Sequence, residues 1–519
     1  MWHARLMLDR SPSRDTTHGD RVDVGALWRG VLTATTALGA AEAAAWWAGV
    51  ASPIDDAARI SVDTAPHAVV EETVARFGTA DKPMIRAGVA ATVAAALAAG
   101  TGLGSRRARL GSVAGLVALD AWAAQRRAPR RTPRGHAAVA AASAGAALVS
   151  PLAPPRVAVG LAAAGAAAWR STHRSRVAQV DGVDARLQAE PLVADEQLAP
   201  LDDGAHDWPG VEPLPTTSDG LFATDVNLRP LLVPRDTWTL KVTGHVEREL
   251  ELDDEALRAL GTVEADIAMV CIHTRPGWLR QGTPRWIGVP VSRVLDAAGV
   301  RPGAVDVRSV AVDGFSARHG VGSLLADDAL IAIGMDGHRL TPGHGAPARL
   351  LVPGLFGQYS GVKWLTELQV TDRRASFYWE SRGFPVAVQG VLPASRIDAV
   401  DGVKVPVGAD GRTLPGDRGA VRAAAGRVEL VGGAWAPRND GVDVVEISVD
   451  HGTWRPAELA REIAPAAQRR WRHVVDLAPG EHVVRVRTRA ADGTPQAERF
   501  TPPGMTGATG LHRLRVHVA

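Results

Sequence analysis

Apolar residues follow two patterns along this chain of 519 residues, and the change between the patterns divides the chain into two parts. In the first third they form long stretches rich in alanine, whereas beyond about residue 220 they form short runs and alternating positions. Long apolar stretches are typical of membrane-spanning helices, and short or alternating runs are typical of strands. The pattern predicts a helical membrane region followed by a part built from strands and short helices.

Residues 1–170 predict a membrane region with four or five helices. The apolar stretches are 28–50, 83–104, 110–124, 137–149 and 157–169. The last two are short and weakly apolar, so a soluble alanine-rich hairpin or one re-entrant element is the alternative for them. No histidine lies within the five stretches, so a haem held by two histidines is not expected, and the region is interpreted as an anchor.

Arginines beside these stretches give opposing indications of topology. Those in the N-terminal tail favour a cytoplasmic start, and five spans would then place the rest of the chain outside the cytoplasm. The arginine-rich segment 126–134 would also lie outside, against the positive-inside tendency, whereas four spans would keep it and the later residues inside. The segment 105–110 is similar to a twin-arginine export signal. We predict a multi-pass protein of the cell membrane, with its catalytic part on the extracytoplasmic side.

Residues 216–384, which follow a polar linker at 171–215, carry the candidate chemistry around Cys271. It is the only cysteine, so it cannot form a disulfide within the chain. It lies in the short apolar run 267–272, directly before a loop with Gly and Pro, where a strand end could meet a pocket. Such a thiol serves as a buried hydrophobe, a nucleophile or a metal ligand. A nucleophile would need a histidine and a carboxylate nearby, and no pattern supports that triad.

Five motifs in this part of the chain together resemble the sulfite oxidase family of molybdenum enzymes. They are the Cys271 loop, Arg285-Trp286-x-Gly-Val-Pro290, Gly334-Met-Asp-Gly337, His344-Gly-x-Pro-x-Arg349-x-x-Val-Pro-Gly354 and Val362-Lys363-Trp364-Leu365. Their order and spacing are similar to those of the molybdopterin-binding domain in that family. The resemblance therefore implies a mixed α+β fold for residues 216–384.

The resemblance also implies roles for single residues. It makes the Cys271 thiolate the protein's ligand to molybdenum, beside the sulfur atoms of a molybdopterin, and a soft thiolate suits such a metal. It implies that His344, Arg349 and Lys363 contact the phosphate and ring of the pterin, since cations and backbone amides stabilise a buried phosphate. Asn227 falls where the family has residues that contact the cofactor at the entry of the domain.

Two departures from the animal enzymes leave the substrate open. Ile333 stands where those enzymes have a tyrosine near the metal, and the loop after Cys271 lacks their pattern. Sulfite is an anion, and its pocket would need cations. The candidate cations are Arg275, Arg280, Arg285 and Arg318, of which Arg285 is predicted to be catalytic beside Cys271. Because His273 and Trp278 could line a pocket for another substrate, sulfite oxidation and the reduction of sulfoxides or other oxo compounds are both open.

Residues 385–519 are rich in strands and turns. Alternating apolar residues at 442–450 and 481–487 predict an antiparallel β-sandwich. This part is similar to the immunoglobulin-like dimerisation domain of the family, which implies a possible homodimer. Within it, Ser395-Arg396 is a candidate to reach toward the active site.

These features together predict a membrane-anchored, molybdenum-dependent oxidoreductase that transfers an oxygen atom to or from a small substrate. The expected partners are the substrate, membrane lipid and an unidentified electron donor or acceptor, because no haem module is evident. Nucleic acid is not expected, since the net charge of +2 is close to zero for this length. The alternative is a non-catalytic membrane scaffold that keeps the fold, which the altered residues around Cys271 and at Ile333 motivate.

Overall fold

The chain divides by its internal contacts into two units, which we describe separately. The first holds the described residues of 1–56, 87–124 and 132–173, and the second holds those of 57–86, 125–131 and 174–519. The structure is a computed structural model. It describes residues 24–48, 52–65, 84–92, 95, 138–139, 141–142, 144–146 and 154–519 apart from 225, 228, 326–327, 388 and 408–418.

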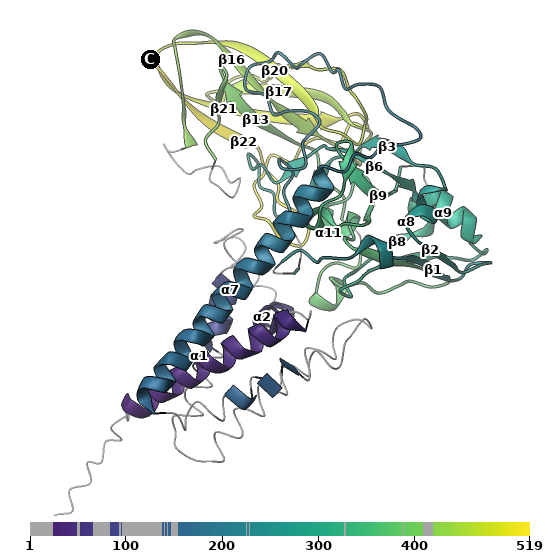
Figure 1. The fold of residues 1–519 in the computed structure, drawn as a ribbon. Coiled ribbons are helices and arrows are strands. Elements are labelled where there is room, and N and C mark those ends of the chain that lie inside the picture. The colour runs from purple at the N-terminus through teal and green to yellow at the C-terminus, as the bar shows by residue number, and fades with distance from the viewer. Residues whose placement is uncertain are drawn as a thin grey trace, which may run out of the picture. The chain divides into compact units, whose positions relative to one another are not determined.

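Long helices made largely of small residues form the described part of the first unit. Helix α1 spans Val24–Trp47, and α7 spans Pro155–Gln188 and continues into the second unit (Figure 1). A Cβ added to Gly39 of α1 would lie 2.2 Å from the carbonyl oxygen of Gly165 of α7, so only glycine permits this close approach. The buried face of α1 consists mostly of alanine, including Ala34, Ala37, Ala41 and Ala45. The small residues therefore allow close packing between helices.

The prediction of a multi-span membrane region was wrong for the part of the chain that the structure describes. Within that part, no helix combines the length and the apolar character needed to cross a bilayer. Most residues of α1 are Ala, Gly and Thr rather than the large aliphatic residues that favour insertion, and α7 contains several charged residues. The same finding overturns the predicted multi-pass location in the cell membrane with an extracytoplasmic catalytic part. The predicted span 110–124 and the segment 105–110 lie outside the described residues, and the predicted spans 83–104 and 137–149 lie partly outside them.

Two sheets and short helices form the first part of the second unit, which is mixed α+β as predicted. One sheet has the order β2-β1-β12-β7-β8, and the other has the order β10-β9-β6-β3, with β11 also paired to β9. The strands of the first sheet are β1 Leu240–Gly244, β2 Leu250–Leu252, β7 Asp306–Ala311, β8 Ser316–Gly320 and β12 Leu365–Thr371. Those of the second are β3 Val263–Asp266, β6 Arg285–Pro290, β9 Leu330–Met335, β10 His338–Arg339 and β11 Arg349–Leu351. The helices are α8 Asp254–Arg258, α9 Val291–Ala298, α10 Val321–Leu325 and α11 Gly357–Ser360.

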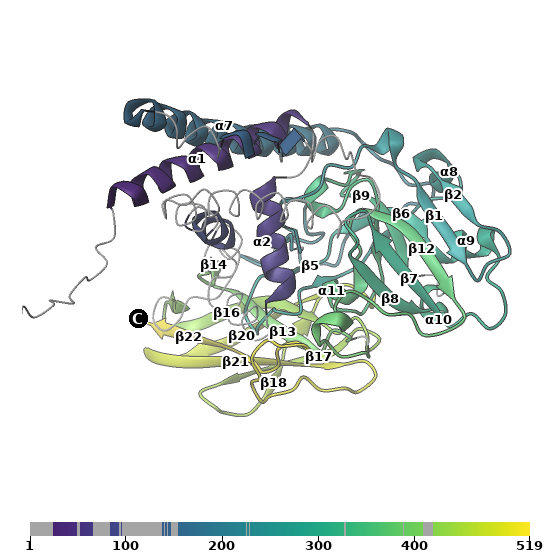
Figure 2. The ribbon, with the colours of Figure 1, turned by 90° about the horizontal axis from the view of Figure 1, so that it is seen from below.

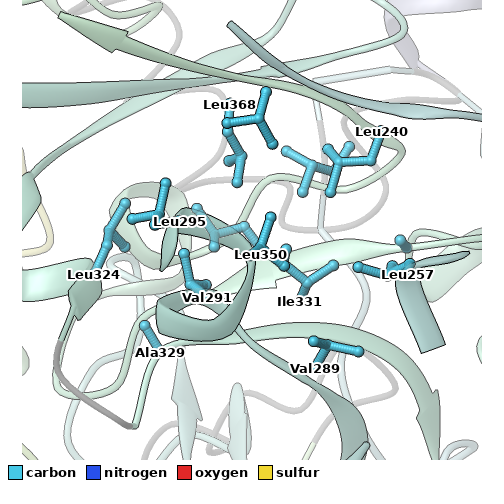
Figure 3. Packing of buried hydrophobic residues seen from close by; sticks show 14 of the residues in the cluster. Leu240, Leu257, Val289, Val291, Leu295, Leu324, Ala329, Ile331, Leu350 and Leu368 are labelled. Carbon is cyan, nitrogen blue, oxygen red and sulfur yellow. The ribbon is translucent and has the colours of Figure 1, made fainter. Parts of the chain in front are cut away.

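An aliphatic core joins these two sheets (Figure 3). Leu240 of β1 and Leu368 of β12 come from one sheet, and Ile331 of β9 comes from the other; all three are fully buried. Helix α9 adds Val291 and Leu295, which lie one turn apart and so share a face of the helix. Burying each of these side chains contributes roughly 1.5–3 kcal/mol. This core fixes the strands whose ends carry the candidate site.

Two stacked five-stranded sheets form the C-terminal part, so the predicted β-sandwich is present (Figure 2). Their orders are β14-β13-β16-β20-β19 and β15-β22-β21-β17-β18. The strands of the first are β13 Ala394–Val400, β14 Val403–Lys404, β16 Gly426–Trp435, β19 Glu458–Leu459 and β20 Arg469–Leu477. Those of the second are β15 Val421–Ala423, β17 Val442–Val449, β18 Arg455–Pro456, β21 Gly480–Ala490 and β22 His512–Val518.

The sandwich contacts the segments before and after Cys271. The Ala268 N–H donates to the Ala466 carbonyl at 2.8 Å, and the Gln468 N–H donates to the Thr283 hydroxyl at 3.0 Å. Arg396, on β13, lies 3.4 Å from the Trp278 carbonyl through its Nη1. Arg396, a candidate to reach toward the active site, therefore contacts the loop that follows Cys271.

We predict that His512 makes the fold sensitive to acid. Burial and the nearby charge of Arg396 lower the pKa of His512 to about 3, and its Nδ1 accepts from the Ile397 N–H at 3.0 Å. The folded protein therefore binds fewer protons here than the unfolded chain, and stability falls as pH drops from about 6.5 toward 3, by about 1.4 kcal/mol per pH unit.

The measurement is denaturant unfolding of the wild type and a His512→Gln variant between pH 7 and 4. The variant is expected to lose less stability with acid, although it starts from a lower value. Two parallel curves would contradict the assignment.

Candidate active site

Cys271 directly follows β4, Met269–Val270, and lies within the short hairpin that β4 forms with β5, Gln281–Gly282. Its backbone N–H donates to the Arg280 carbonyl at 3.0 Å, and its own carbonyl accepts from the Thr274 N–H at 2.9 Å. This pairing sets Cys271 and Arg280 opposite each other, with both side chains on one side of the hairpin. Both residues are buried, so Arg280, one of the candidate cations, is not a solvated surface arginine.

The surroundings of the Cys271 thiol stabilise negative charge only in part. Burial raises the pKa of the thiol, while the His273 N–H and the guanidinium of Arg280 oppose that rise. A bound metal ion would supply the remaining positive charge and deprotonate the sulfur. The sequence did not distinguish the role of Arg280 from that of the other arginines near Cys271.

Arg285, predicted to be catalytic, is held by an acidic partner. Its Nε and Nη2 donate to the two oxygens of Asp266 at 3.0 and 2.8 Å, and its Nη1 donates to the Ala199 carbonyl at 2.9 Å. The next residue, Trp286, donates from its indole N–H to the Ile267 carbonyl at 3.0 Å. Arg285 and Trp286 therefore fix the segment that leads into Cys271.

The other candidate cations are also engaged. Arg275 lies 5.0 Å from the ring centre of Trp278, in cation–π geometry, and Arg318 binds Asp306 at 3.0 Å. Ile333, at the position of the tyrosine in animal enzymes, is fully buried in the aliphatic core. No tyrosine chemistry is available at that position.

His344, Arg349 and Lys363 come together, as the sequence predicted for a cofactor cradle. His344 ends the short 3-10 helix Pro342–His344, Arg349 begins β11, and Lys363 precedes β12. Arg349 Nη1 donates to the His344 carbonyl at 3.1 Å. A Cβ on Gly345, which has a φ of 102°, would lie 2.9 Å from Cβ of Lys363, so this approach requires glycine.

Arg349 is a buried cation without a carboxylate partner among the described residues. Its side chain contacts the His344 carbonyl and the Trp286 ring, 5.2 Å away, while its Nε is buried without a hydrogen bond. Burial lowers the pKa of Arg349 to about 10. Arg339, by contrast, binds both oxygens of Asp254 at 2.8 and 2.9 Å. An unpaired buried cation is costly, so Arg349 requires an anion that the described protein groups do not supply.

His344 offers a complementary polar atom beside this cation. Its Nε2 donates to the Ser218 carbonyl at 2.9 Å, and its Nδ1 is buried without a partner in the described structure. Burial and the charges of Lys363 and Arg349 lower the pKa of His344 to about 4, so the ring is neutral at pH 7. Nδ1 is therefore a free acceptor that would take a hydrogen bond from an N–H of a ligand. Ser218, which fixes this tautomer, had no sequence signal.

Asn227 lies farther along the segment that contains Ser218. Its amide is buried and donates from Nδ2 to the Asp313 carboxylate at 2.7 Å. The side-chain amide of Gln281 is also buried. Neither its oxygen nor its nitrogen has a hydrogen-bond partner among the described residues. Hydrogen bonds to Asp313 and to Arg59 hold the amide of Asn227.

Similarity to known proteins centres on this part of the chain. Residues 228–379 match the family model of the oxidoreductase molybdopterin-binding domain. The uncharacterized oxidoreductase YuiH of Bacillus subtilis is 31% identical over 147 residues, covering 28% of this chain and 72% of that protein. Mitochondrial sulfite oxidase of Drosophila melanogaster is 27% identical over 268 residues, covering 46% of this chain and 45% of that protein. NAD(P)H nitrate reductase of Hordeum vulgare is 29% identical over 262 residues, covering 41% and 28%. The chain thus spans less than half the length of the latter two enzymes.

The residues present fit a molybdopterin. The unpaired cation of Arg349 suits its phosphate, and the acceptor Nδ1 of His344 suits an N–H of its ring. Cys271, buried opposite Arg280, suits a thiolate ligand for the metal.

We predict that replacing Arg349 by Met lowers cofactor content without destabilising the cofactor-free fold. Removing an unpaired buried charge is neutral or favourable for folding, whereas the phosphate would lose its cation. The matched control is Arg339→Met, which leaves Asp254 without its buried partner and costs about 1–3 kcal/mol. Melting temperatures and pterin content would be measured for both variants. A larger loss of stability for Arg349→Met than for Arg339→Met, with normal pterin content, would contradict the cradle.

Proposed function

The chain belongs to the family of oxidoreductases with a molybdopterin-binding domain, and we propose that it transfers an oxygen atom to or from a small substrate, either sulfite or a sulfoxide-type compound. The chemistry that it uses is molybdenum-dependent oxidation and reduction. The observation that carries the proposal is the buried Cys271 thiol opposite the buried Arg280 guanidinium. This arrangement places a fixed positive charge beside the atom that would hold the metal.

The bound cofactor supplies a metal centre that changes oxidation state by two electrons and exchanges an oxygen atom. Cys271 would hold this centre, and Arg349 and Lys363 of the cradle would neutralise the phosphate of the pterin. Arg280 is positioned to attract an anionic substrate and to orient it by a charge-assisted hydrogen bond. Arg285 acts through position, since its pairing with Asp266 fixes the start of the segment that carries Cys271.

The substrate class rests on charge. Sulfite is an anion and would gain from Arg280, whereas a neutral sulfoxide would gain less. Relatives named sulfite oxidase and nitrate reductase act on oxyanions according to their names, which favours an oxyanion for this chain as well. A scaffold that has lost turnover remains the outcome if the purified chain contains neither metal nor pterin.

X-ray absorption at the molybdenum edge tests the ligand. A Cys271→Ser variant is expected to show one sulfur fewer around molybdenum than the wild type, because the pterin sulfurs remain and the thiolate is gone. Wild-type protein loaded in the same host is the control. An unchanged sulfur count in a loaded variant would refute the assignment.

Steady-state kinetics test the substrate class. Arg280→Met is expected to lower kcat/KM for sulfite by about 10- to 100-fold, since a hydrogen bond to a charged group contributes about 1.5–3 kcal/mol. It is expected to change a neutral sulfoxide much less. Arg248→Met, at an exposed position, serves as the control. Equal losses for both substrates would show that Arg280 does not select an anion.

A further inference from the structure

An arginine from the N-terminal third of the sequence lies among residues of the molybdopterin-binding part. Arg59 belongs to α2, Pro53–Thr64, which is labelled in Figure 1. Arg59 and the two residues that it binds, Asn227 and Asp313, all belong to the second unit. Arg59 Nη1 binds the side-chain oxygen of Asn227 and lies 3.2 Å from the Asp313 carboxylate. Its Nη2 donates to the Asp313 backbone carbonyl at 3.3 Å. Arg59 therefore meets both residues with one planar group.

These three side chains form a closed cluster, which we call the Arg59 cluster. Asn227 Nδ2 donates to the same Asp313 carboxylate at 2.7 Å, and Asp313 also accepts from the Phe315 N–H at 3.0 Å. The side chains of Arg59 and Asp313 are only 11% and 4% exposed, so the ion pair is largely shielded from water. Removing one member of such a pair would leave an uncompensated buried charge. Arg59 and Asp313 therefore depend on each other.

The Arg59 cluster adjoins the cofactor cradle on two sides. Asp313 follows Val312, whose N–H donates to the carbonyl of Trp364 at 3.0 Å, and Trp364 directly follows Lys363. Asn227 lies at one end of the segment 218–227, and Ser218 at the other end accepts from His344. Ser218 is thus bonded to the cradle, and Asn227 is bonded within the Arg59 cluster.

We propose that Arg59 is a positioning residue for the molybdenum cofactor, which holds Asn227 and so fixes the far end of the segment 218–227 beside the cradle. The proposal rests on the proposed function in one respect, the predicted contact of Asn227 with the cofactor. A residue from outside the molybdopterin-binding part then contributes to cofactor retention. Neither α2 nor Arg59 lies within the residues 228–379 that match the family model.

The test is the rate at which the loaded, full-length protein releases pterin, followed by pterin fluorescence well below the unfolding temperature of every variant. Arg59→Ala is expected to release the cofactor about tenfold faster, the effect of losing a hydrogen bond to a charged group. Arg59→Lys, which keeps the charge, is expected to lie between Arg59→Ala and the wild type. Arg339→Met is the matched control, because it breaks a buried ion pair elsewhere and should release at the wild-type rate.

A double variant separates positioning from a general loss of stability. If Arg59 acts through Asn227, then Arg59→Ala with Asn227→Ala should release no faster than Asn227→Ala alone. Release at the wild-type rate from Arg59→Ala, or additive effects in the double variant, would overturn the inference. A wild type that holds no pterin would instead overturn the proposed function, so the two failures are distinguishable.

Discussion

The burial of Arg349 without a carboxylate is the constraint on which the site depends. The guanidinium of Arg349 loses its hydration on burial. Among the described residues it gains only a hydrogen bond to the His344 carbonyl and a contact with the face of Trp286. The fold nevertheless makes room for it, since a Cβ on Gly361 would lie 2.7 Å from its Nη2. Such an arrangement is stable when an anion completes it. The rest of the cradle also suits an anion. Lys363 adds a second cation, and His344 stays neutral between the two charges.

The fold and the cradle were predictable to the extent that their signals are local. Alternating apolar residues predicted the strands, and the resemblance to the sulfite oxidase family implied that His344, Arg349 and Lys363 act together on one cofactor. Contacts between residues far apart in the sequence are not local signals. The sequence therefore could not show that Arg285 pairs with Asp266, or that the Ser218 carbonyl fixes the tautomer of His344. An arginine in a polar loop looks exposed in a sequence, and only the register of the hairpin shows that Arg280 is buried beside Cys271.

The error in the first third has a physical explanation of the same kind. Alanine and glycine raise the apolar content of a helix whether it faces lipid or another helix. In α1 and α7 the decisive positions are Gly39 and Gly165, whose backbones approach too closely for any side chain. Glu42, buried near the end of α1, accepts from the Ser52 hydroxyl and so links α1 to the start of α2. A count of apolar residues detects none of these contacts, because each depends on the partner and not on the helix itself.

Charge connects the two halves of the site. The thiol of Cys271 faces Arg280, and the cradle holds Arg349 and Lys363, so both places are positive before any ligand binds. Asp313, whose chain neighbour Val312 bonds to the backbone beside Lys363, is already paired with Arg59. A ligand that carries a phosphate at one end and metal-bound sulfur at the other would balance both places at once. Two separate positive places suit a cofactor with two anionic ends better than a small anion, because a small anion could neutralise only one of the two.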